Sequence, residues 1–227
     1  HLHLKLSQFV PDLGLSWRIL RIGIPGLGQM FSRSLMSAVM MRIVALCGTT
    51  AVAAYGVGMR FHMIILMPAF ALGGAAATMV GQNLGAGKPE RARHAAWVAT
   101  LLDVGIMAVS AIVIFVLAPA LIRVFNNEPE VIKIGTHYLR IVSPFYVFAA
   151  LGVVLSRALN GAGDSVAPMI ITIATLWILQ VPLAILFARI WQPATVGIWW
   201  AIVVAFVVQG LLTTAWFELG RWKKKRV

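Results

Sequence analysis

Apolar residues along the chain fall into six long runs separated by short polar stretches. A run of about 20 residues is long enough to cross ~30 Å of hydrocarbon as a helix. In a bilayer such a run must satisfy its own backbone, and the dyad alternation of a membrane barrel is missing. The sequence therefore predicts an all-α membrane protein with six transmembrane helices within residues 22–217. The runs are Ile22–Leu46, Val57–Val80, Ala95–Leu121, Leu139–Leu155, Val166–Ala188 and Val196–Phe217.

Composition supports the same class. The chain is 60% apolar and 11% charged, whereas a soluble domain carries about 25% charged residues. Its formal net charge of +12 lies between the apolar runs and in the tail, not along one face, which argues against a nucleic-acid partner. No HExxH, GxSxG or Cys/His cluster is present, so we expect no enzyme activity, no metal site and no organic cofactor.

Lys and Arg predict the orientation in the membrane. They gather before the first run, in the turn after the second and in the tail 218–227, which the positive-inside rule places in the cytoplasm. We expect a multi-pass protein of the inner (plasma) membrane with both ends of this segment cytoplasmic. Residues 1–21 would form a cytoplasmic linker and interfacial segment. Tryptophans such as Trp199 and Trp222 fall near the ends of runs, as in an interfacial aromatic belt.

Val80–Arg93, V-G-Q-N-L-G-A-G-K-P-E-R-A-R, is the sharpest polar interruption. Its glycines allow an apolar helix to stop, and Pro89 followed by Glu90 is typical of a new helix start. A phosphate-binding loop is excluded because Lys88 precedes proline rather than Ser or Thr. The stretch predicts a cytoplasmic turn between two membrane helices.

The first run carries polar residues on one helical face. Arg33 lies near its middle, where a charge costs at least ~2.5–3.5 kcal/mol unless it is paired or hydrated. Two interpretations remain open for Arg33: a cavity-lining group that contacts substrate, or a structural arginine bound to backbone carbonyls. The second run adds a methionine stripe, which suits either a soft cavity wall or ordinary packing. The substrate-cavity candidates are Gln29, Arg33, Met36, Ser37, Met40, Met63 and Met67.

Asp103 is the only carboxylate well inside a run. A buried carboxylate suits proton or sodium coupling, but pairing with an interfacial Lys or Arg explains it equally well. It is a weak candidate for ion coupling, with H+ or Na+ as the suspected ion.

Three stretches together resemble a known family. Val80–Arg93, Arg157–Ser165 (R-A-L-N-G-A-G-D-S) and Arg42–Arg60 are similar, in order and spacing, to turns in the carboxyl half of multidrug and toxic compound extrusion (MATE) transporters. The resemblance implies one lobe of a two-lobe (6+6) transporter, with the first two helices bordering a central cavity. Some members carry a cation-binding glutamate on the first helix of this half; Gln29 and Arg33 stand there instead, so no coupling residue is carried over. The family-motif positions are Gly81, Gln82, Asn83, Gly85, Gly87, Glu90, Arg91, Gly161, Gly163 and Asp164.

The resemblance implies ion-coupled efflux of hydrophobic or cationic drugs and toxic compounds. The chain begins at His1 rather than Met, so we expect a carboxyl-terminal fragment whose partner is the missing amino-terminal half of the same transporter. Two alternatives remain: a lipid-linked saccharide flippase of related architecture, left open by Arg33, Arg42 and Arg60, and an inactive truncated membrane protein.

Overall fold

The computed structural model describes residues 13–224, which fold into helices without a strand in that range. Long helices dominate, and short 3-10 or π segments join or end some of them. The elements are α1 Leu13–Ala45, α2 Thr49–Gly85, α3 Pro89–Arg123, α4 Pro129–Val142, η2 Ser143–Phe145, α5 Tyr146–Gly161, α6 Val166–Ile173, η3 Ala174–Gln180, α7 Val181–Ile190, α8 Ala194–Glu218 and η4 Arg221–Lys224.

These elements form six membrane-length segments, because α4 to α5 and α6 to α7 each run on as one segment. Five segments of the described chain are both long and apolar enough to cross a membrane. The segment left out is α1, which is long enough but carries polar side chains along one face. It begins at Leu13, inside the predicted linker; residues 1–12 of that linker and 225–227 of the predicted tail lie outside the described residues.

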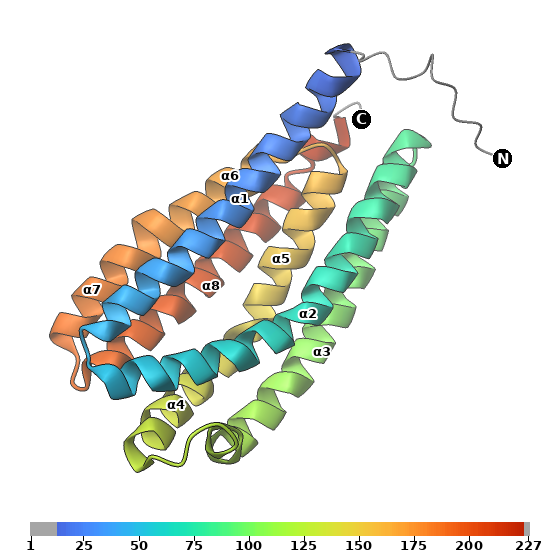
Figure 1. Ribbon diagram of the computed structural model, residues 1–227. Coiled ribbons are helices and arrows are strands. Elements are labelled where there is room, and N and C mark those ends of the chain that lie inside the picture. Colours follow the sequence, from blue (N-terminus) through green and yellow to red (C-terminus); the bar gives the residue numbers. More distant parts are fainter. Residues whose placement is uncertain (1–12, 225–227) are drawn as a thin grey trace, which may run out of the picture.

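Prolines interrupt the longer segments. Pro68 lies inside α2, which changes direction along its length in Figure 1. Pro144 stands in η2, and Pro182 follows the π-helical turn of η3. A proline cannot donate its backbone hydrogen bond and crowds the preceding turn, so each helix bends or rewinds there.

The two glycine-rich turns end their helices in the same way. The Lys88 amide donates to the Asn83 carbonyl at 2.8 Å, and the Asp164 amide donates to the Leu159 carbonyl at 2.9 Å. In both turns a glycine takes the left-handed conformation, Gly87 at φ +69° and Gly163 at φ +76°. This is the Schellman ending, which requires such a residue. Pro89 then starts α3 with Glu90 in its first turn, as the sequence predicted.

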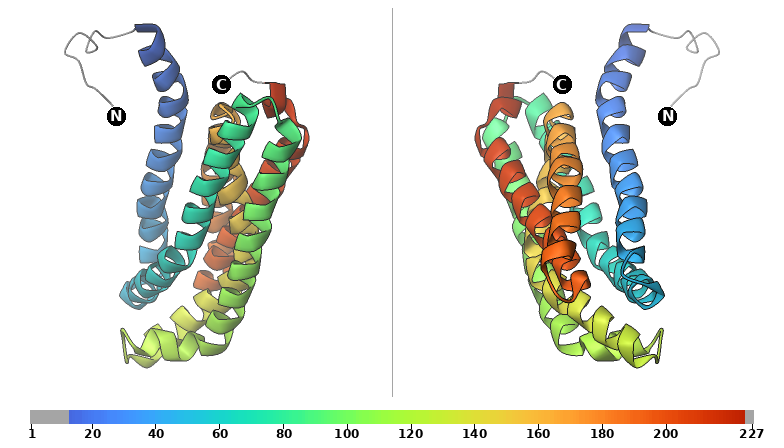
Figure 2. Two further views of the ribbon diagram at one scale, coloured as in Figure 1. Left: turned by 90° about the vertical axis from the view of Figure 1, so that its right-hand side faces the viewer. Right: turned by 90° about the vertical axis from the view of Figure 1, so that its left-hand side faces the viewer.

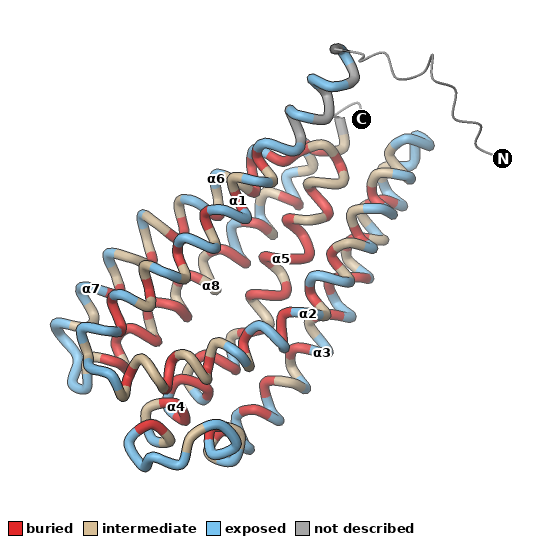
Figure 3. The backbone as a smooth tube through the Cα atoms, viewed as in Figure 1, coloured by how far each residue is buried: buried red, intermediate tan, exposed pale blue. Residues whose placement is uncertain are grey.

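The helices separate into two sides around α5. On one side α1 lies beside α6, and on the other α2 lies beside α3, while α5 packs against α2, α3 and α8 (Figure 1). Two opposite side views show α1 and α2 meeting at their joining turn and separating toward their other ends (Figure 2). Burial is greatest where α5 and α8 face their neighbours, and the outward sides of the helices are exposed (Figure 3).

The α2–α5 contact is close enough to need residues without side chains. A Cβ atom at Gly161 would lie 2.6 Å from the Ala77 Cα, and one at Gly81 would lie 3.1 Å from the Gly161 carbonyl oxygen. Small residues let helices approach in this way in membranes, where packing replaces the hydrophobic effect.

The carboxyl-terminal residues fold back onto α3. Glu218 accepts hydrogen bonds from Arg93 at 2.6 Å and from Trp97 at 2.7 Å. Beyond Gly220, Lys223 pairs with Glu90 at 2.8 Å. These contacts join the start of the third membrane segment to the end of the sixth, and give part of the basic tail a role inside the lobe.

Two predicted belt tryptophans are buried instead. Trp199 is fully buried and stacks on Tyr55, with ring centroids 5.4 Å apart. Trp222 is also fully buried, stacks on Phe217 and donates its indole N–H to the Phe217 carbonyl at 2.8 Å. Their rings therefore pack against protein rather than facing lipid as belt residues do, because position along a run does not say which face a ring occupies.

Candidate functional site: a cavity between α1 and α2

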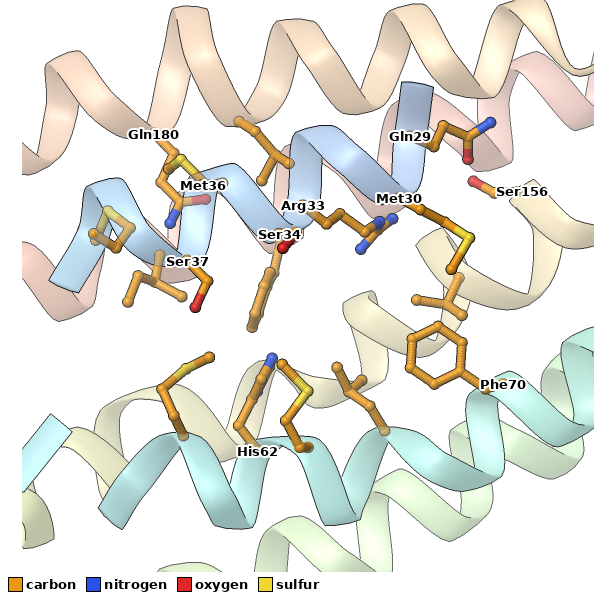
Figure 4. Close-up of a pocket in the computed structure, with 18 of the residues that line it drawn as sticks. Gln29, Met30, Arg33, Ser34, Met36, Ser37, His62, Phe70, Ser156 and Gln180 are labelled. Carbon is orange, nitrogen blue, oxygen red and sulfur yellow. The ribbon is translucent and has the colours of Figure 1, made fainter. Parts of the chain in front are cut away.

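A cavity of about 680 Å³ lies between the two sides of the lobe. This volume is within the range of about 300–1,000 Å³ that is usual for small-molecule sites. Most of its lining comes from α1 and α2, with contributions from α4, α5, η3 and α8. Side chains from α1 and α2 face each other across the open space in Figure 4.

Six of the seven residues proposed from the sequence line this cavity. They are Gln29, Arg33, Met36, Ser37, Met40 and Met63. The first five repeat at helical spacing on α1, which explains how one pattern brings them to one space. Met67 does not line the cavity and is 63% exposed on the outside of α2.

Two hydrogen bonds set the rotation of α1 against its neighbours. Gln29 Nε2 donates to the Ser165 carbonyl at 3.4 Å, and the Trp177 indole N–H donates to Ser32 Oγ at 2.7 Å. Both partners lie on the α6–η3 side, so these bonds hold one edge of α1 and leave Arg33 on the edge that faces the cavity.

Arg33 points from α1 into the open space (Figure 4). Within residues 13–224 its guanidinium makes no hydrogen bond and no ion pair. The described structure therefore does not show the carbonyl-bound arrangement that was one interpretation of Arg33.

His62 faces the same space from α2 (Figure 4). Its Nδ1 lies 3.3 Å from the Tyr146 hydroxyl, and its ring stacks on Phe206 with centroids 5.5 Å apart. These two contacts fix the ring at the wall. His62 was not among the candidates from the sequence, because one sequence does not identify the partners of a lone histidine.

Arg157 is a charged lining residue that was not among the candidates from the sequence. It comes from α5, and its guanidinium lies over the Phe70 ring, 5.0 Å from the centroid. Gly73 makes room for it, because a Cβ there would lie 2.6 Å from Arg157 Cδ. The position of Arg157 could have been inferred from its contact with Gly73 on α2. One sequence alone does not reveal that these two residues lie opposite each other. Ser156, Asn160 and Gln180 also line the cavity without having been predicted.

Asp103 lies outside this cavity. It is fully buried in α3, and neither carboxylate oxygen has a hydrogen-bond partner among the described residues. It forms no ion pair with a described Lys or Arg, so the interfacial pairing offered as one explanation is not observed.

The family-motif residues shape turns and helix contacts rather than the cavity wall. Gly87 and Gly163 end helices, Gly81 and Gly161 lie at the α2–α5 contact, and Glu90 pairs with Lys223. Gln82 and Gly85 are exposed near the end of α2, while Arg91 and Asn83 line a second, smaller groove between α2 and α3.

Asp164 is buried and accepts a hydrogen bond from the Trp216 indole at 3.0 Å. The neighbouring Ser165 occupies the N-cap position of α6. Asp164 therefore joins the turn before α6 to α8.

Membrane-length helices around an internal cavity define a helical, multi-pass membrane protein with the form of a transporter lobe. Comparison with known families agrees: the model of the MatE family matches residues 25–186. The chain belongs to the MatE family, whose members are transporters rather than enzymes.

Individual relatives show the same membership. The chain is 29% identical to the probable multidrug resistance protein NorM of Thermotoga maritima, over 99% of this chain and 48% of that protein. It is 31% identical to the probable multidrug resistance protein YpnP of Bacillus subtilis, over 92% of this chain and 46% of that protein. The chain thus spans about half the length of these curated relatives.

Solved structures support the six-helix lobe. A MATE crystallised in the straight conformation matches with a TM-score of 0.90 at 22% identity, over 99% of this chain and 51% of that one. A MOP superfamily transporter from Pyrococcus furiosus, described as having a binding pocket of reverse polarity, matches with a TM-score of 0.82 at 22% identity, over 90% of this chain and 45% of that one. At this identity the likeness concerns the fold.

Proposed function

We propose that this chain is the carboxyl-terminal lobe of a two-lobe, ion-coupled exporter of hydrophobic drugs and toxic compounds in the plasma membrane. The observation that carries the proposal is the cavity between α1 and α2, which is lined by methionines, a side chain that adapts to varied apolar shapes, and by a few polar groups. The names of the curated relatives and the half-length match add support. The second lobe would supply the opposite wall of the substrate path.

Coupling to H+ or Na+ is the finer part of this proposal. Asp103 is its candidate, because a buried carboxylate without a partner in the described structure suits reversible binding of a cation. The orientation expected from Lys and Arg places both ends of the segment in the cytoplasm.

The test uses the two-lobe protein in membrane vesicles with imposed proton or sodium gradients. Ser37→Trp would fill the cavity, and Ala38→Trp, at the next position of α1 but exposed outside it, is the matched control. We expect Ser37→Trp to reduce dye efflux to background while Ala38→Trp transports normally. Equal efflux by the two variants contradicts the cavity assignment, and efflux that ignores both gradients contradicts ion coupling.

A second candidate function is flipping of a phosphate-bearing lipid. The specific observation in its favour is that Arg33 and Arg157 line the cavity. Arg42 and Arg60, which were considered with Arg33 in the sequence, do not line it and are exposed. A flippase moves a fluorescent lipid between leaflets without net dye efflux, and that measurement separates the two functions.

A further inference from the structure

Two guanidinium groups lie at one end of the cavity. Arg33 extends from α1 toward the end where Phe70 and Ser156 are found (Figure 4). Arg157 comes from α5 and rests over that same Phe70 ring. Gln180 and Met36 lie toward the other end of the view, so the positive charge is concentrated rather than spread through the space.

No carboxylate of the described chain lines the cavity to balance them. The sequence contains seven acidic residues, and Asp12 lies outside the described residues. The other six are engaged or placed elsewhere: Glu90, Glu130 and Glu218 in ion pairs, Glu128 at the start of α4, Asp164 beside Trp216 and Asp103 inside α3.

On the part of the wall that this chain supplies, the arrangement disfavours a cation as occupant. Two like charges at one end of a cavity repel each other and would repel a cationic group bound between them, whereas an anionic group is attracted to both and reduces their mutual repulsion. An arginine also offers a planar set of donors that fits a carboxylate or phosphate with two parallel hydrogen bonds. Arg33 has all of its donors free of described protein partners.

We propose that the Arg33–Arg157 end of the cavity binds a compact anionic group, a carboxylate or phosphate, of an amphipathic substrate. The apolar part of that substrate lies against the methionine side chains of α1 and α2, namely Met30, Met36, Met40, Met59 and Met63. The inference rests on the proposed function, since it names the substrate class of the same cavity. The sequence-based expectation was hydrophobic or cationic compounds; Arg157, the second charge, was not visible as a lining residue from sequence.

Binding to the purified two-lobe protein tests the proposal with three probes that share one apolar body. These are 1-pyrenebutyrate, its neutral methyl ester and 1-pyrenebutylamine. We expect the unmodified protein to bind the carboxylate most tightly and the amine most weakly. Arg33→Gln and Arg157→Gln should each weaken pyrenebutyrate binding by roughly tenfold or more, the usual effect of losing a charged hydrogen-bond donor, and leave the ester unchanged.

Arg42→Gln is the matched control, because Arg42 lies on the same helix, is exposed and does not line the cavity. It should bind all three probes as the unmodified protein does. Tighter binding of the amine than of the carboxylate by the unmodified protein overturns the proposal, whether or not the glutamine variants fold. An unchanged affinity for pyrenebutyrate in both folded glutamine variants overturns it as well.

The anionic group has two sources, and a further arm separates them. The same titration is run in phosphatidylcholine nanodiscs with and without phosphatidylglycerol. If phosphatidylglycerol competes with pyrenebutyrate for the unmodified protein but not for Arg33→Gln, the anionic group is a lipid headgroup. If phosphatidylglycerol does not compete with pyrenebutyrate, the anionic group belongs to a soluble compound. If gradient-driven efflux is not observed, the proposed function is wrong, but the binding preference can still be measured. Failure of the proposed function is therefore distinguishable from failure of the anion-binding proposal.

Discussion

Gly161→Ala is the substitution whose effect follows most directly from the packing. The new methyl group would lie 2.6 Å from the Ala77 Cα and would overlap the Ala77 carbonyl oxygen. Both are backbone atoms of α2, so no side-chain rotation relieves the overlap. Helices α2 and α5 must separate by roughly 1 Å, and overpacking of this kind costs about 1–3 kcal/mol.

Part of that cost is offset, because alanine is better than glycine in a helix by about 0.5–1 kcal/mol. The net loss is therefore on the order of 1–2 kcal/mol. At about 2–4 °C per kcal/mol for a chain of this size, the apparent Tm should fall by roughly 2–8 °C. The measurement is the fraction of monodisperse purified protein that remains after heating.

Gly74→Ala is the control, because Gly74 lies on α2, the helix that Gly161 packs against, and its new methyl group meets nothing within 4 Å. It should keep or raise the Tm. If the two variants behave alike, the close α2–α5 approach does not limit stability and the packing argument is wrong.

Three further predictions concern topology, coupling and the placement of α1. In a Cys47→Ala background, cysteines at Lys88 and Gln192 should react with impermeant thiol reagents from opposite sides; labelling from one side refutes the six-segment topology. Asp103→Asn should fold with unchanged yield and make efflux insensitive to the imposed gradient, whereas a normal gradient response would assign Asp103 to structure. Trp177→Phe removes the 2.7 Å bond to Ser32 and should cost about 1 kcal/mol in thermal stability, unlike Trp191→Phe, which breaks no described indole hydrogen bond.

Local pattern predicted the helices and their turns well, for identifiable reasons. Runs of apolar residues must be helical in a bilayer, and Gly87 and Gly163 occupy positions where a helix ending requires a left-handed residue. The spacing of Gln29, Arg33, Ser37 and Met40 likewise places them on one face of α1, independently of whether that face contacts another helix, lipid or a cavity.

Pairing between distant segments was not predictable from one sequence. Nothing in the sequence indicates that Arg157 lies against Gly73, a residue of a different helix. Trp199 looked like a belt residue until Tyr55 and Tyr138 enclosed it. Periodicity shows which residues share one face of a helix. Which other helix that face packs against depends on contacts between residues that are far apart in the sequence.

Because of the contacts between the tail and α3, the α3 helix is synthesised well before the residues that complete its packing. Arg93 and Glu90 leave the ribosome well before Glu218 and Lys223, the residues with which they pair. During that interval the third membrane segment is inserted with its charged end unpaired. The α3–α8 edge closes only when the last helix has been delivered, so a nascent chain stalled before Glu218 leaves Arg93 and Trp97 without the carboxylate that both contact in the folded lobe.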